Sequence, residues 1–199
     1  MHISEGVLNA PVLVAGFAAT AAGLAVGIKK MDAHNMPKIA VLSASFFIAS
    51  LIHVPIGPSS VHLVLNGLTG IILGWTAFPA IAVALAMQAL MFQFGGITTL
   101  GINTVNMALP AVLCFYLFRR IVRTRSTRAV MAAGFFCGFL SIAVSALLVA
   151  LSLACIDRAF LTPAKIILIA HLPVMVIEGI ITAFCLVFLK RVKPELLEM

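Results

Sequence analysis

The amino-acid sequence predicts an all-α, polytopic membrane protein of about seven transmembrane helices, with its N-terminus outside the cell and its C-terminus in the cytoplasm. First, 63% of the residues are hydrophobic and only 10% are charged, whereas soluble domains carry roughly a quarter of charged residues. Second, apolar runs that approach or reach the length of a membrane span, about 17–25 residues, recur along the whole chain. Third, the basic residues gather in a few segments between these runs.

The apolar runs define the expected helices. We place seven of them at residues 9–28, 39–54, 61–75, 79–94, 104–118, 129–154 and 165–189. The third and fourth runs are short, and only the break at Trp75–Pro79 separates them. No linker divides the chain, so residues 1–199 are expected to form one transmembrane domain.

The basic residues predict the orientation. They follow the first run (Lys29, Lys30, Lys38), the fifth run (Arg119, Arg120, Arg123, Arg125, Arg128) and the last run (Lys190, Arg191, Lys193). Seven spans put these three segments on one side, and only Arg158 and Lys165 of the 13 basic residues remain on the other. If the third and fourth runs formed a single span, the three basic segments would be divided between the two sides of the membrane. By the positive-inside rule the C-terminus is cytoplasmic. The net charge of +7 therefore reflects the orientation of the chain in the membrane. We expect the segment 119–128 to lie beside anionic lipid or to contact a cytoplasmic partner subunit.

The chain opens with a metal chelator that needs no fold to assemble it. The α-amine of Met1, the amide nitrogen of His2 and the Nδ1 atom of His2 close two fused chelate rings. Three coplanar nitrogens suit Ni(II) or Cu(II) better than Zn(II) or Mg(II), and binding weakens as the pH falls because the amide must lose its proton. No cleavable signal peptide is visible, so we expect this terminus to persist. Any chain can begin with Met-His by chance, and the dipeptide alone is a weak signal.

Two histidines flank a turn on the same predicted outer side. His53 and His62 enclose a segment with two prolines and a glycine, and Asn66 follows His62 at the spacing of one helical face. Each histidine is interpreted either as a hydrogen-bonded interface residue or as a fourth metal ligand. The ligand interpretation is favoured for His62 but not for His53.

A second outer loop, residues 94–107, is rich in Gly, Thr and Asn and has no formal charge. Asn103 and Asn106 are candidates to orient a ligating histidine through hydrogen bonds. The alternative is an ordinary polar surface loop. Residues 96–101 resemble the start of a phosphate loop, but Ile102-Asn103 replaces the required Lys-Ser/Thr. We therefore expect no ATP binding by this chain.

The last run contains His171, Pro173 and Glu178. An acidic residue within the membrane is costly and marks a pathway, a proton relay or a buried hydrogen-bonded group. Both a transport role and a purely buried role remain open for Glu178.

Four stretches together resemble the CbiM/NikM family, the substrate-binding membrane subunit of energy-coupling-factor (ECF) transporters for cobalt and nickel. They are residues 1–8 (MHISEGVL), 54–62 (VPIGPSSVH), 95–104 (GGITTLGINT) and 177–179 (IEG). The resemblance covers essentially the whole chain, and residues 61–67 (VHLVLNG) favour the nickel branch.

The resemblance implies an ATP-driven ABC-type importer at the cell (inner) membrane, in which this chain captures Ni(II) or Co(II). The metal is then a transported substrate and not a cofactor, and the chain is not an enzyme. The implied ligands are the amine of Met1, two nitrogens of His2 and the imidazole of His62. The implied partners are a transmembrane coupling subunit, cytoplasmic ATPase subunits and a small accessory membrane protein.

A competing hypothesis is a self-contained secondary transporter of divalent metals. In that case Glu178 and His171 would form a proton relay. The absence of a visible inverted repeat argues against it.

Overall fold

The computed structural model describes residues 2–51, 53–56, 59–124, 126–156 and 158–197. The helices are α1 (Ala10–Lys29), α2 (Met36–Ala49), α3 (Asn66–Leu73), α4 (Ala77–Phe92), α5 (Leu100–Val122), α6 (Thr127–Ala154) and α7 (Leu161–Val192). Short 3₁₀ turns lie at η1 (Ala33–Asn35), η2 (Gly74–Thr76), η3 (Arg158–Phe160) and η4 (Pro194–Leu196). Two strands, β1 (His53–Ile56) and β2 (Ser59–His62), form an antiparallel hairpin that pairs His53 with His62.

The long helices confirm a helical membrane protein. Within the described residues, five segments are long and apolar enough to span a bilayer: α1, Asn66–Phe92, α5, α6 and α7. α2 has 14 residues, fewer than the about 20 that a perpendicular span needs. The count of seven spans and the orientation across the membrane remain predictions.

The predicted third helix is wrong in its first part. The apolar run at 61–75 begins in β2 and a loop, and α3 has only 8 residues. His62 therefore lies on a strand, and its predicted helical pairing with Asn66 does not form. Local hydrophobicity could not show this, because a short apolar run can form either a strand or a helix.

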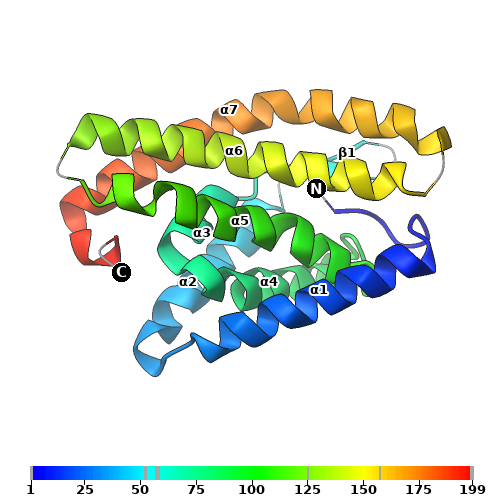
Figure 1. The fold of residues 1–199 in the computed structure, drawn as a ribbon, viewed down its shortest axis with the longest axis horizontal. Coiled ribbons are helices and arrows are strands. Elements are labelled where there is room, and N and C mark those ends of the chain that lie inside the picture. The colour runs from blue at the N-terminus through cyan, green and yellow to red at the C-terminus, as the bar shows by residue number, and fades with distance from the viewer. Residues whose placement is uncertain (1, 52, 57–58, 125, 157, 198–199) are drawn as a thin grey trace.

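The helices pack closely through small residues. α6 and α7 run side by side, α5 lies between them and α1, and α1 forms the opposite side of the bundle (Figure 1). A Cβ atom at Gly138 of α6 would lie 2.4 Å from the carbonyl oxygen of Glu178 on α7, and one at Gly70 of α3 would lie 2.1 Å from that of Ala111 on α5. Such close approach supplies the van der Waals contact that holds helices together in lipid.

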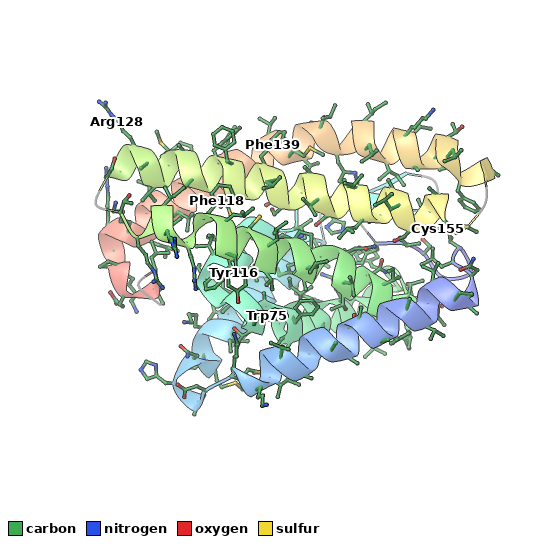
Figure 2. The ribbon with its side chains drawn as sticks, viewed as in Figure 1. Trp75, Tyr116, Phe118, Arg128, Phe139 and Cys155 are labelled. Atoms are coloured by element: carbon green, nitrogen blue, oxygen red, sulfur yellow. The ribbon has the colours of Figure 1, made fainter. Side chains whose placement is uncertain are left out.

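Polar contacts join the elements at one end of the bundle. Trp75 in η2 and Tyr116 in α5 point toward one another (Figure 2), and the indole Nε1 donates to the Tyr116 hydroxyl at 2.9 Å. Lys190 near the end of α7 donates from Nζ to the carbonyl oxygen of Thr124 at 2.6 Å. The basic segments 119–128 and 190–193 therefore lie at the same end, as the topology prediction requires.

Candidate functional site

The N-terminal segment, residues 2–8, is inserted into the bundle without forming a helix. It runs from the middle of the molecule toward the start of α1 (dark blue in Figure 1). His2 is 4% exposed, and Ile3 is completely buried. The main chain of Ile3 is held by Asn103 of α5: Ile3 N donates to Oδ1 at 2.9 Å, and Nδ2 donates to the Ile3 carbonyl at 3.1 Å.

The outer part of this segment is tied to the loop between α4 and α5. Glu5 N donates to the carbonyl oxygen of Gly95 at 3.0 Å. The Glu5 carboxylate accepts from the main-chain N–H of Thr98 at 2.9 Å and from its hydroxyl at 3.1 Å. These bonds, the main-chain one first, hold the pKa of Glu5 below its ordinary value. At neutral pH the carboxylate is ionised and anchors the segment.

His2 and His62 meet face to face. Their ring centroids lie 4.6 Å apart at an interplanar angle of 28°, and Phe94 flanks the His2 ring at 6.2 Å. The fold brings one ring from the inserted terminus and the other from the end of β2. Both imidazoles are buried, so the pair sits away from bulk water.

Gln88 of α4 selects the tautomer of His2. Its Nε2 atom donates to the carbonyl oxygen of Phe47 at 3.2 Å and to the hydroxyl of Ser50. Because a carbonyl can only accept, the amide nitrogen must face Phe47, and the amide oxygen then faces His2. The contact of 2.9 Å between His2 Nε2 and Gln88 Oε1 is therefore donated by the imidazole. In the neutral imidazole the lone pair is then on Nδ1, the nitrogen that the Met-His chelate requires.

His62 is likewise fixed as one neutral tautomer. Its Nδ1 lies 3.0 Å from the carbonyl oxygen of Leu63, so this nitrogen carries the proton. Its Nε2 atom is buried and has no hydrogen-bond partner among the described residues. Burial also holds the pKa of His62 well below its usual range. The lone pair on Nε2 is therefore available to a metal ion at neutral pH.

The site is built from nitrogen donors. Within the part of the chain that the structure describes, no three His, Cys, Asp or Glu side chains cluster as metal ligands. Two buried imidazoles suit a transition metal that prefers nitrogen, whereas Mg(II) and Ca(II) prefer oxygen.

The predicted asparagines make different contacts, and two of the other predicted residues lie outside the part that the structure describes. Among the described hydrogen bonds, those of the Asn103 side chain go to the main chain of Ile3 and to the hydroxyl of Thr99. Asn66 is buried and donates from Nδ2 to the hydroxyl of Ser145 at 3.0 Å, and Asn106 is buried with no hydrogen bond from its Nδ2 to any described residue. Met1 and the side chain of His53 lie outside the described residues.

The two ionisable residues of α7 make separate contacts. Glu178 accepts from the main-chain N–H groups of Val64 and Leu65, the latter at 2.8 Å. His171 donates from Nδ1 to the carbonyl oxygen of Ile167 at 2.7 Å. Seven residues of helix separate the two side chains by about 10 Å along the axis. No direct contact joins them among the described interactions.

Gln88 is the residue that sequence reasoning missed. The only signal was its amide within the apolar run 79–94, between Met87 and Ala89. A buried polar side chain in such a run requires a partner, but the sequence does not show that the partner is His2.

Comparisons with known proteins show the family and the fold. Residues 2–196 match the CbiM family, described as the cobalt uptake substrate-specific transmembrane region. A putative metal transport protein of Haemophilus influenzae is 38% identical over 99% of this chain and 97% of its own length. A fused nickel transport protein of Rhodobacter capsulatus is 32% identical over 99% of this chain, which spans 64% of that protein. A solved transition metal transporter has a TM-score of 0.83 and 27% identity, covering 96% of this chain and 93% of that structure.

Proposed function

The chain belongs to the CbiM family of substrate-specific membrane components of cobalt and nickel uptake, and from this premise we propose that it captures Ni(II) or Co(II) with its own N-terminus and His62. The chain is a multi-pass protein of the cell membrane. The metal is its transported substrate, in keeping with relatives that are named transport proteins.

The observation that carries the proposal is the stacked pair of His2 and His62 with both tautomers fixed. His2 Nδ1 and His62 Nε2 bear lone pairs within one buried site. The amine of Met1 and the amide nitrogen of His2 belong to the same chelate as His2 Nδ1 through covalent geometry alone. The proposed ligand set is therefore four nitrogens in a plane, which suits Ni(II) and also accepts Cu(II).

The segment 61–67, which resembles the nickel branch, favours nickel as the main substrate. Energy is proposed to come from partner chains, because the sequence has no phosphate loop of its own. These partners are a transmembrane coupling subunit, cytoplasmic ATPase subunits and a small accessory membrane protein. The basic end of the bundle, with the segments 119–128 and 190–193, is the proposed cytoplasmic face.

The competing relay through Glu178 and His171 has less support. The two side chains are about two helical turns apart and each is bonded to a different main-chain group. A self-contained transporter predicts metal uptake by the purified chain in vesicles without ATP or partner chains. The importer subunit predicts metal binding without transport.

The first experiment measures Ni(II) and Co(II) binding by the purified chain and by a version whose Met1 amine is acetylated. Acetylation keeps every side chain but removes the amine as a metal ligand. We expect nickel affinity to collapse, whereas amidation of the C-terminal carboxyl group should leave it unchanged. Retained affinity in the N-acetylated chain would mean that the amine of Met1 is not a ligand.

A further inference from the structure

Glu178 is buried in α7, yet it acts on the segment that carries His62. Its side chain is 0% exposed. Oε1 accepts from the main-chain N–H groups of Val64 and Leu65, and these residues directly precede α3. The other carboxylate oxygen, Oε2, has no hydrogen-bond partner among the described residues. The described hydrogen bonds of this carboxylate are therefore directed to this one segment.

These two N–H groups lie at the start of a helix that has no cap of its own. Leu65 occupies the N-cap position of α3 with φ 59°, and its side chain makes no capping hydrogen bond. The first N–H groups of a helix have no partner within it, and a carboxylate at that end is favoured by the helix dipole. Glu178 thus serves as a cap supplied by another helix, and it fixes the unusual backbone of Leu65.

The Leu63–Val64 peptide group connects this cap to the ring of His62. Its carbonyl oxygen accepts from His62 Nδ1 at 3.0 Å, and its N–H donates to Glu178 Oε1. The Glu178 carboxylate is thus linked through this peptide group to the imidazole of His62. Histidines that bind metals commonly donate their second ring proton to a carboxylate or a carbonyl, which orients the ring and raises its basicity. Here the carbonyl is itself polarised by a buried carboxylate, and linked hydrogen bonds strengthen one another.

We propose that Glu178 is the positioning residue for His62, acting through the Leu63–Val64 peptide group to aim Nε2 at the metal and to make it a stronger ligand. This inference rests on the proposed function of His62 as a ligand. It also gives α7 a mechanical link to the metal site, because a movement of α7 relative to α3 acts on the His62 segment through these two bonds.

The test compares Glu178→Gln and Glu178→Leu with Thr182→Val as a matched control. Thr182 is buried on the same face of α7, and its hydroxyl has no hydrogen-bond partner among the described residues. Gln keeps an acceptor oxygen but removes the charge, whereas Leu removes both. Loss of an outer partner of a ligating histidine typically lowers metal affinity about 10–100-fold. We expect such a loss in Glu178→Leu, a several-fold faster release of Ni(II) in Glu178→Gln, and native behaviour in Thr182→Val.

The chemical shift of the His62 Nδ1 proton, measured in the metal-free protein, tests this inference independently of the proposed function. In the metal-free protein at alkaline pH, where Glu178 is ionised, the Nδ1 proton of His62 should resonate at lower field than in Glu178→Gln, because the charge strengthens its hydrogen bond to Leu63. Native metal release together with an unshifted His62 proton in Glu178→Gln would overturn the inference, and this isosteric variant remains informative even if Glu178→Leu does not fold. If the proton shifts but the native chain binds no nickel, the link from Glu178 to His62 stands and the proposed function fails.

Discussion

Asn103 holds the main chain of Ile3 on both sides of the residue. Its Oδ1 accepts from Ile3 N at 2.9 Å, while its Nδ2 donates to the Ile3 carbonyl at 3.1 Å and to the hydroxyl of Thr99 at 3.2 Å. A side-chain amide thus takes the place of a neighbouring strand. Because Ile3 follows His2 directly, this contact determines how far the terminus enters the bundle and where the His2 ring lies.

Replacing Asn103 should therefore weaken metal binding without removing a ligand. In Asn103→Leu the buried N–H and C=O of Ile3 lose their partners, and an unpaired buried group costs about 1–3 kcal/mol. Since 1.4 kcal/mol is a factor of ten, we expect nickel affinity to fall by about 10–100-fold in calorimetric titrations. Thr104→Val on the same helix is the control, because the described hydrogen bond of the Thr104 hydroxyl stays within α5, to the Leu100 carbonyl. Equal affinity in the two variants would show that Asn103 does not set the depth of insertion.

A second prediction concerns the tautomer of His2. Gln88→Leu removes the acceptor for His2 Nε2–H, so the ring can place its proton on Nδ1 and lose the chelating lone pair. We expect about a 10–100-fold loss of nickel affinity, as for other outer partners of ligating histidines. Nitrogen chemical shifts of His2 should report a mixture of tautomers.

Ser50→Ala provides the matched comparison for Gln88. It removes one hydrogen bond of the Gln88 amide nitrogen but leaves Phe47 to fix the orientation of the amide. A much smaller loss is expected. If Ser50→Ala weakens binding as much as Gln88→Leu, the effect reflects packing around α4 and not the tautomer.

Alanine substitutions at Gly95 and Gly6 test how closely the loop at residues 94–99 packs against the N-terminal segment. Gly95 and Gly6 have nearly the same φ, +76° and +75°. A Cβ atom at Gly95 would lie 2.8 Å from Asn103 Nδ2 and 3.4 Å from two atoms of His2, whereas at Gly6 nothing lies within 4 Å. Both alanine variants bear the left-handed backbone cost of roughly 1–2 kcal/mol, but only Gly95→Ala should lower nickel affinity. Equal affinities in the two variants would contradict this close packing.

The sequence was a good guide to the helices because a membrane imposes one requirement on every span. Backbone groups in lipid must bond within the segment, so long apolar runs become helices. The predicted runs 129–154 and 165–189 lie inside α6 and α7. The prediction for the run at 61–75 failed because its first residues form part of β2 and a loop, and non-helical backbone at membrane depth is tolerated where it lies within protein.

The candidate site was predictable where the chemistry is local and hidden where it depends on tertiary contacts. The proposed Met1-His2 chelate was inferred from the first two residues alone. The stacking of His2 against His62 depends on the insertion of residues 2–8 and could not be predicted from sequence spacing. The partners of Gln88 and Glu178 are main-chain or distant side-chain groups. No spacing in the sequence encodes such contacts, although the cost of burying these two polar residues in apolar runs indicates that partners exist.

The last prediction is the effect of acid on the inserted terminus. The pKa of Glu5 is lowered by the Thr98 main-chain bond and then by the Thr98 hydroxyl bond. A group with a lowered pKa in the folded state stabilises that state above its unfolded pKa and loses this contribution as the pH falls through the folded value. The anchor from Glu5 to Thr98 should therefore be intact from neutral pH down to the ordinary carboxyl range and be lost only below it.

Hydrogen exchange at the Glu5 amide, which donates to Gly95, measures this release in the metal-free protein. After correction for the intrinsic pH dependence, protection should fall in an acid step. Glu5→Gln should have no such step, because its amide does not titrate in this range. Thr98→Val keeps the main-chain bond but removes the hydroxyl, so its step should move toward higher pH. An identical acid step in Glu5→Gln would assign the release to another group.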